Sequence, residues 1–224
     1  MTDVHSIETP THGRVLVTKA TTRPASGRLV AFHGYAQSAD DALADVLGVP
    51  GASTWDIAAV QALHRFYSRG EERVIASWMT RQDRELAIAD NVAYVDRVIE
   101  QVAPGAGAGS LVFIGFSQGA AMAYRAAVLG RHRAAGVIAL GGDIPPEVKA
   151  AGAAALPPVL IGAGDAETWY TGARAEADVA FLASRRVAHD VVRYRGGHEW
   201  TEEFRAAAGR WLERVTARRT ATRP

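Results

Sequence analysis

The sequence predicts an α/β fold in which a mostly parallel central sheet carries helices on both faces. Short apolar runs alternate along the chain with longer amphipathic segments, and this alternation is typical of βαβ units. The length of 224 residues, of which 48% are hydrophobic, suits one domain with a packed core. We therefore expect a single domain over residues 1–224, with a core from about 13 to 215 and no separate cap domain. A polar amino-terminal arm and a basic carboxy-terminal tail flank that core.

Apolar runs bounded by glycine, proline or polar residues mark the expected strands. These are Arg14–Thr18, Leu29–Phe32, Ile57–Val60, Val74–Ala76, Leu111–Phe116, Gly136–Leu140, Val159–Ala163 and Val191–Tyr194. The expected helices run from Ser38 or Asp40 to Leu47, from Asp83 to Ala103, from Gln118 to Leu129, from about Gly172 to Arg186, and from about Thr201 to Val215. The second helix has the clearest period, with one apolar face formed by Leu86, Val92, Val95, Ile99 and Val102. The longest connection runs over residues 63–82 and can fold over the site.

Composition and charge exclude several classes of protein. The chain has 25 basic and 24 acidic residues, so it offers no field that would attract nucleic acid. It has no cysteine, which excludes disulfides, thiolate metal sites and a cysteine nucleophile. Residues 1–14 are polar and no apolar run is long enough to span a bilayer, so we expect a cytoplasmic protein without membrane insertion. We expect no metal and no cofactor, because no metal-binding or nucleotide-binding motif is present.

A G-x-S-x-G motif, Gly115–Gly119, lies between a predicted strand and a predicted helix. In that context the serine stands on a sharp turn with its hydroxyl clear of the sheet, and the helix amino terminus lies where an oxyanion would form. Ser117 is therefore the expected nucleophile. A serine hydroxyl needs a base, and His198 follows the last strand in a glycine-rich loop that can carry an imidazole over the sheet end.

Two aspartates compete for the acid that orients the base. Asp165 and Asp143 each follow a predicted strand. We prefer Asp165, because its strand should neighbour the strand that leads to His198. Glu167 lies two residues further on, and we interpret it as a carboxylate at a helix start.

Backbone amides and aromatic side chains complete the expected site. The run His33–Tyr35 closes another buried strand, where the loop of a hydrolase sheet donates an amide to the oxyanion hole. We assign the two oxyanion amides to Tyr35 and Gln118. Aromatic placement suggests an apolar acyl pocket, with candidate substrate-binding residues Trp78, Trp169, Trp200 and His64.

Taken together, the segments Gly115–Ala123, His33–Tyr35, Gly164–Asp165 and Gly197–His198 resemble the phospholipase/carboxylesterase family of α/β-hydrolases, which includes acyl-protein thioesterases and small serine esterases. The resemblance extends from about residue 13 to 215. It implies serine-dependent hydrolysis of esters or thioesters, with the triad Ser117, Asp165 and His198 in the chain order of α/β-hydrolases.

One departure concerns the substrate. Relatives that act on acylated proteins or lysophospholipids usually carry a valine-proline pair after the acid, whereas here residues 166–170 read Ala-Glu-Thr-Trp-Tyr. The expected function is cleavage of carboxylic or thio esters of small to medium acyl groups, with a small-molecule ester as substrate. The alternatives are a non-catalytic binding or regulatory protein on the same fold, and a peptidase or lactonase that uses the same triad. The oligomeric state stays open, a homodimer included.

Overall fold

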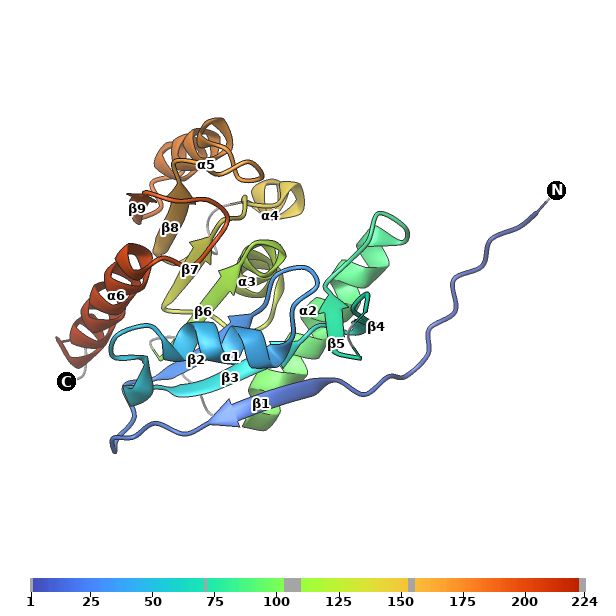
Figure 1. Cartoon of the computed structure of the whole chain (residues 1–224), viewed down its shortest axis with the longest axis horizontal. Coiled ribbons are helices and arrows are strands. Elements are labelled where there is room, and N and C mark those ends of the chain that lie inside the picture. The colour runs from blue at the N-terminus through green and yellow to red at the C-terminus, as the bar shows by residue number, and fades with distance from the viewer. Residues whose placement is uncertain (1, 71, 103–109, 153–155, 222–224) are drawn as a thin grey trace.

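Seven strands form one sheet through the centre of the computed structural model, which describes residues 2–70, 72–102, 110–152 and 156–221 (Figure 1). The order across the sheet is β1 (Arg14–Thr18), β3 (Asp56–Gln61), β2 (Arg28–Phe32), β6 (Leu111–Phe116), β7 (Gly136–Leu140), β8 (Val159–Gly164) and β9 (His189–Tyr194). The edge strand β1 pairs antiparallel with β3, and the other neighbouring strands pair in parallel. The predicted fold class is confirmed.

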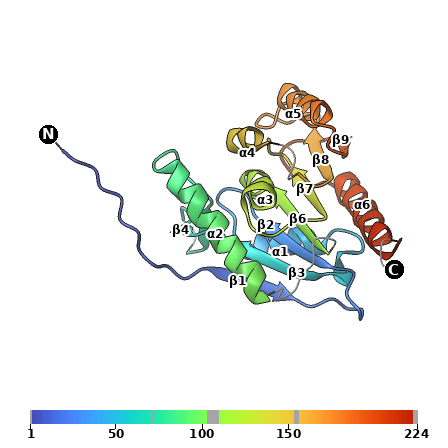
Figure 2. The same cartoon turned by 180° about the vertical axis from the view of Figure 1, so that it is seen from behind.

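Helices cover both faces of this sheet, as Figures 1 and 2 show from opposite sides. One face packs against α1 (Ala39–Leu47) and α6 (Glu202–Ala221). The other face packs against α2 (Arg84–Val102), α3 (Gln118–Leu129), α4 (Pro146–Ala151) and α5 (Gly172–Ser184). Successive side chains of a strand point to opposite faces, so both faces of β6 are apolar and its residues form a continuous hydrophobic run. No helix in the described ranges is both long enough and apolar enough to cross a membrane.

The six parallel strands bring the loops that follow them to one edge of the sheet. Their carboxyl ends are in register, with the pairs Phe32 and Gly115, Phe116 and Leu140, and Gly164 and Tyr194. The loops after β3, β2, β6, β7, β8 and β9 therefore begin side by side. Ligands bind at this edge in open α/β sheets.

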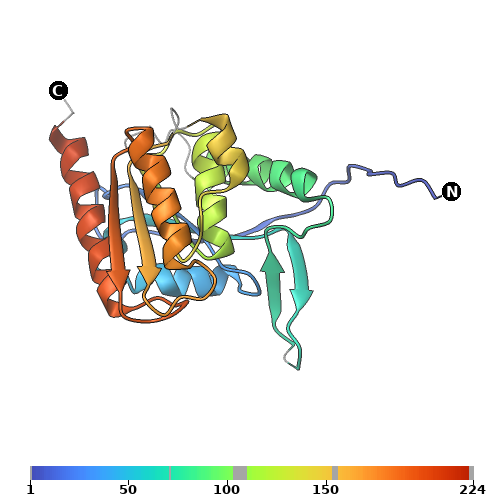
Figure 3. The same cartoon turned by 90° about the horizontal axis from the view of Figure 1, so that it is seen from above.

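The structure differs from the predicted elements in several places. The long connection contains a second small sheet, the hairpin of β4 (His64–Tyr67) and β5 (Val74–Ser77), which stands away from the helices in Figure 3. The short α4 and a 3-10 turn at Ala52–Thr54 were not predicted, and α6 continues to Ala221. Leu86 is 50% exposed, and its neighbours Ala87 and Ile88 are buried in its place.

Candidate active site

Ser117 occupies the turn between β6 and α3 in an unusual backbone conformation. Its φ and ψ angles are 55° and −119°, values that a residue with a side chain rarely adopts. Its amide donates a hydrogen bond of 2.8 Å to the carbonyl of Leu140, which anchors the turn to the neighbouring strand. Helix α3 begins at the next residue, so Ser117 occupies the cap position at the amino terminus of this helix.

The two glycines of the motif are required by close packing. A Cβ on Gly115 would overlap the backbone of Gly119, and a Cβ on Gly119 would overlap the carbonyls of Phe32 and His33. The motif therefore lets helix α3 begin directly against the end of β2.

The imidazole of His198 lies beside the residues that flank Ser117. Its ring centroid is 4.7 Å from that of Phe116, and a Cβ built on Gly141 would lie 3.1 Å from its Cε1 and Nδ1 atoms. Within the described part of the chain, Ser117 Oγ makes no hydrogen bond, so none joins the serine to the imidazole. Catalytic hydrogen bonds are often long without substrate and tighten in the complex.

The acid that contacts His198 is Glu167, and the preference for Asp165 was wrong on this point. His198 Nδ1 donates a hydrogen bond of 2.6 Å to Glu167 Oε2. Asp165 Oδ1 instead accepts a 2.9 Å hydrogen bond from the Gly196 amide, which ties the loop after β8 to the loop after β9. The strand order that favoured Asp165 is correct, because β8 and β9 are neighbours. Asp143, the second candidate, is not the partner of this nitrogen either.

The local fold explains why Glu167 reaches the imidazole. Asp165 directly follows β8, its amide donates to the carbonyl of Tyr194, and its side chain is exposed. The Glu167 side chain is fully buried and its Oε1 accepts a hydrogen bond from the Trp169 amide at 2.8 Å. The sequence contains one signal for this role, because Glu167 is an acidic residue two positions after Asp165. Its interpretation as a carboxylate at a helix start was wrong, since the next helix, α5, begins at Gly172.

Electrostatics keep Glu167 ionised. Burial has the largest effect on its pKa and raises it, but the Trp169 amide, the His198 ring and the Tyr170 amide together outweigh burial and hold the pKa below its usual value. A carboxylate held in this way can orient the imidazole and stabilise its protonated form.

Two backbone amides in the loop after β2 are already engaged in hydrogen bonds on either side of Tyr35. The Gly34 amide donates to Gln37 Oε1 at 2.6 Å, and the Ala36 amide donates to the Ala76 carbonyl at 3.1 Å. Between them, the Tyr35 amide has no hydrogen-bond partner among the described residues, and its side chain is 62% exposed. Of the candidate donors in this loop, Tyr35 is thus the one left free.

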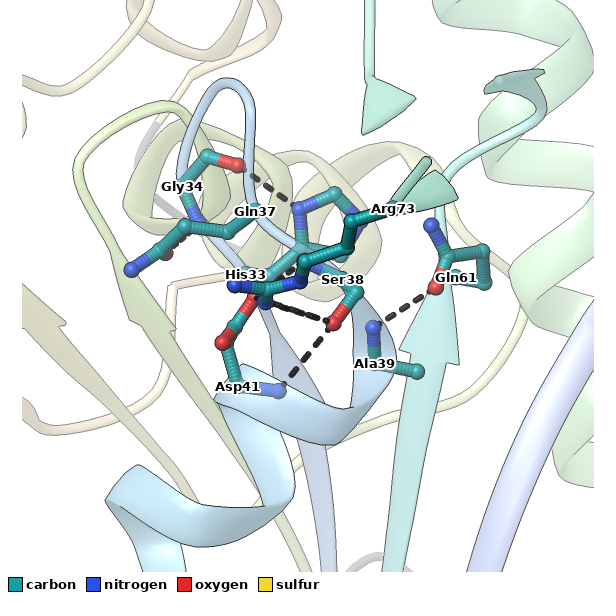
Figure 4. A network of polar contacts seen from close by, with 8 residues as sticks. All are labelled: His33, Gly34, Gln37, Ser38, Ala39, Asp41, Gln61 and Arg73. Carbon is teal, nitrogen blue, oxygen red and sulfur yellow. Dashed lines mark hydrogen bonds and ion pairs between the residues drawn. The ribbon is translucent and has the colours of Figure 1, made fainter. Parts of the chain in front are cut away.

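Polar contacts hold this loop to helix α1 and to the hairpin, as Figure 4 shows. The hydroxyl of Ser38 accepts a hydrogen bond from the Asp41 amide and caps α1. Arg73 of the hairpin forms an ion pair with the Asp41 carboxylate. Gln61 Oε1 accepts a 2.7 Å hydrogen bond from the Ala39 amide, which fixes the start of α1 against the end of β3.

His33 supports the loop as a neutral imidazole. Its Nδ1 donates to the Gly34 carbonyl at 2.7 Å and its Nε2 accepts from the Ala62 amide at 3.0 Å. Burial lowers the pKa of His33, more than the hydrogen bond to Gly34 raises it. Both ring nitrogens are therefore engaged in structure.

The side chain of Gln118 joins the start of α3 to the strand that ends the hairpin. Its Oε1 accepts from the Trp78 amide at 2.8 Å, and its Nε2 donates to the Met79 carbonyl and to Ser77 Oγ, each at 3.2 Å. The Gln118 amide itself has no acceptor among the described residues.

Trp78 does not line a pocket, contrary to the prediction. Its side chain is 0% exposed, and its Nε1 donates to the His33 carbonyl at 2.9 Å. Its ring packs edge-on against Phe32 at 5.5 Å. The sequence suggested that Trp78 lies in a loop. It directly follows β5, whose last three residues are buried, and it packs into the same hydrophobic core as Ala76.

The other three pocket candidates are accessible to different degrees. Trp169, in the loop that carries Glu167, is 62% exposed. Trp200 is partly buried and its ring lies 6.5 Å from that of Phe116. His64 is exposed on β4.

Among the described residues, no group of three or more histidine, aspartate or glutamate side chains is arranged to hold a metal ion.

Comparison with solved structures supports the fold. Esterase PE8 is similar with a TM-score of 0.73 and 21% identity, over 92% of this chain and 100% of that one. The Bacillus cereus carboxylesterase has a TM-score of 0.68 and 17% identity over 91% of this chain and 94% of its own. Zea mays acyl-protein thioesterase 2 has a TM-score of 0.68 and 17% identity over 92% of this chain and 100% of its own.

Sequence comparison identifies the family. A search among curated proteins found none that matches. The sequence model of the phospholipase/carboxylesterase family matches residues 74–213, more than half of the chain and including Ser117, Glu167 and His198. The chain therefore belongs to the phospholipase/carboxylesterase family of hydrolases and has its α/β-hydrolase fold.

Proposed function

We propose that the protein is a serine hydrolase that cleaves carboxylic or thio esters of small to medium acyl groups through an acyl-enzyme on Ser117. The observation that carries this proposal is the backbone of Ser117, held at φ 55° and ψ −119° between β6 and the first turn of α3. Such strain costs free energy and persists where the surrounding structure holds it. At this position it presents the serine hydroxyl to the carboxyl edge of the sheet.

The base and its orienting acid are His198 and Glu167. Because His198 Nδ1 donates to Glu167, the other ring nitrogen, Nε2, is unprotonated in the neutral imidazole and can accept a proton. Nε2 takes the proton of Ser117 Oγ as the oxygen attacks the acyl carbon. Glu167 stays ionised and stabilises the imidazolium that forms. We assign the acid to Glu167 in place of Asp165.

The oxyanion of the tetrahedral intermediate accepts hydrogen bonds from the amides of Tyr35 and Gln118. Both amides lie at the ends of adjacent strands, β2 and β6, and both are without an acceptor among the described residues. Collapse of the intermediate transfers the proton from His198 to the leaving alcohol or thiol. Water then attacks the acyl-enzyme, with the same imidazole as base, and releases the acid and Ser117.

Hydrolysis of short-chain p-nitrophenyl esters by the purified full chain tests the proposal. Ser117→Ala should abolish turnover, and a fluorophosphonate probe should label the wild type but not the variant. Ser184→Ala is a matched control, because Ser184 lies at the exposed end of α5 and its hydroxyl donates, among the described residues, to the Phe181 carbonyl alone. Turnover that survives Ser117→Ala, or a wild type that neither reacts with the probe nor hydrolyses esters, contradicts the proposal.

A panel of substrates defines the acyl group. Rates for an ester and a thioester of the same acid show whether an oxygen or a sulfur leaving group is preferred. Rates for a series of acyl lengths show which chain lengths the pocket accepts. We expect kcat/KM to be highest for small to medium acyl groups. A preference for long acyl chains contradicts that part of the proposal.

A further inference from the structure

We propose that Asp178 is a positioning residue that fixes the two loops on either side of His198. Asp178 lies on α5 and does not belong to the triad, and its role rests on the proposed function above. Its side chain is 1% exposed, so its two carboxylate oxygens are shielded from solvent.

Three groups from three different segments meet at this carboxylate. Oδ2 accepts a hydrogen bond of 2.9 Å from the Ile144 amide and one of 3.1 Å from the Tyr170 hydroxyl. Oδ1 forms an ion pair of 2.7 Å with Lys149 Nζ on α4. Oδ2 thus binds both loops, and Oδ1 forms the ion pair.

The first loop, residues 141–145, forms one wall of the site. Gly141 is the residue whose Cβ would press against the imidazole of His198, and a Cβ on Gly142 would overlap the Ser117 carbonyl. This wall is close to both proposed catalytic groups. The hydrogen bond from Ile144 to Asp178 fixes it two residues further along the chain.

The second loop, residues 165–171, carries the proposed acid. Glu167 binds the imidazole and the Trp169 amide, and Tyr170 follows directly. The Tyr170 side chain is 1% exposed, and its hydroxyl is the group that reaches Asp178. Burial, then the neighbouring Tyr124 and Asp178, raise the pKa of Tyr170, so this hydroxyl keeps its proton and remains a donor.

A single buried oxygen, Asp178 Oδ2, therefore sets the spacing between the loop that packs against the imidazole of His198 and the loop that carries Glu167. Small displacements of such groups are costly, since a shift of about 1 Å in a catalytic geometry can reduce the rate by about 100-fold. A residue with this function affects kcat per folded molecule, whereas a residue that only stabilises the fold affects the number of folded molecules.

The test compares Asp178→Ala, Asp178→Asn and Asp96→Ala in the full chain. Asp96 is a matched control, because it is also a buried helical aspartate that accepts hydrogen bonds from a backbone amide and a basic side chain, both of Arg131. Fluorophosphonate labelling counts the active sites, and kcat and KM for a p-nitrophenyl ester are then expressed per labelled site.

Asp178→Ala should lower kcat per labelled site by about 10-fold or more with KM within about twofold, because orientation rather than substrate binding is lost. Asp178→Asn should stay within about threefold of the wild type, since its amide oxygen can accept both loop hydrogen bonds. Asp96→Ala should lower Tm without changing kcat per site. An unchanged kcat in Asp178→Ala overturns the proposal, and so does an equal loss in Asp178→Asn.

Tyr170→Phe covers the case in which Asp178→Ala does not fold. It removes one hydroxyl and leaves Glu167 and the ion pair in place, and we expect kcat per site to fall by about threefold or more. An unchanged kcat in this variant also overturns the proposal. The proposed function has a separate failure, namely activity that survives Ser117→Ala. If Ser117→Ala is inactive and Tyr170→Phe is fully active, only the positioning role is wrong.

Discussion

The Nδ1 atom of His198 lies 2.6 Å from Oε2 of Glu167, and this hydrogen bond joins the loop after β9 to the loop after β8. The same two loops are joined a second time by the hydrogen bond from Gly196 to Asp165. Two carboxylates two residues apart thus have separate partners, one on the imidazole and one on the backbone.

This division predicts different effects of two conservative substitutions. Glu167→Gln should lower kcat by about 10³- to 10⁴-fold, because an amide cannot stabilise the imidazolium and favours the wrong tautomer. Asp165→Asn should stay within about 10-fold, since its amide oxygen still accepts from Gly196. Steady-state kinetics with a p-nitrophenyl ester measure both variants. A larger loss in Asp165→Asn than in Glu167→Gln would return Asp165 to the triad.

Gly141 should tolerate no side chain. Its φ is +64°, and a Cβ would lie 3.1 Å from the imidazole of His198. Gly141→Ala should therefore lower both kcat and the free energy of unfolding, the latter by about 1–2 kcal/mol from the left-handed backbone alone. Gly51→Ala is the matched control, because Gly51 has a φ of +81° with nothing within 4 Å of a Cβ. The control should lose stability and keep its kcat; a Gly141→Ala enzyme with normal kcat contradicts the prediction.

His33 should make the stability depend on pH in mildly acidic solution. Because burial lowers its pKa from 6.5, the folded state binds the proton less well than the unfolded state. The stabilising contribution is complete above pH 6.5 and is lost as the pH falls from 6.5 through the lowered pKa of the folded state. Urea unfolding at about pH 5 and about pH 8 should show a smaller difference in His33→Gln than in the wild type. Equal differences in the two proteins would show that His33 does not contribute.

Two tryptophans at the site should respond differently to alanine substitution. Trp78→Ala should lower the free energy of unfolding by about 3–5 kcal/mol, because it empties a fully buried site. Trp169→Ala should leave Tm nearly unchanged and raise KM, since its side chain is 62% exposed and its backbone amide still binds Glu167. Thermal unfolding and steady-state kinetics separate the two effects. An unchanged KM in Trp169→Ala would remove this residue from the proposed acyl pocket.

Local signals explain which elements could be predicted from the sequence. Helix α3 was predicted at its observed bounds, Gln118–Leu129, because the strand before it and Gly130 after it are unambiguous. The strand β4 was missed because its pattern, His-Arg-Phe-Tyr, has exposed side chains throughout and gains its partner only by folding back on β5. Propensity alone carries no information about such a pairing.

The site could be predicted to the level of the loops and not of the atoms. Ser117 and His198 follow from motifs that lie next to strand ends. The choice between Asp165 and Glu167 depends on how the chain turns after β8, where the side chain of the first residue points to solvent and that of the third points inward. A difference of two residues in a loop has no periodic signal in the sequence.

The buried position of Trp78 has a consequence for altering the substrate range. Its amide donates a hydrogen bond to the side chain of Gln118, and its indole donates one to the carbonyl of His33. Trp78 therefore connects the segments that carry both proposed oxyanion donors. Replacing this tryptophan with a smaller residue to make room near the site would disturb the donors along with the core. A directed-evolution library is better built on exposed positions such as Trp169 and Tyr35, where side chains can vary while the backbone groups used for chemistry stay in place.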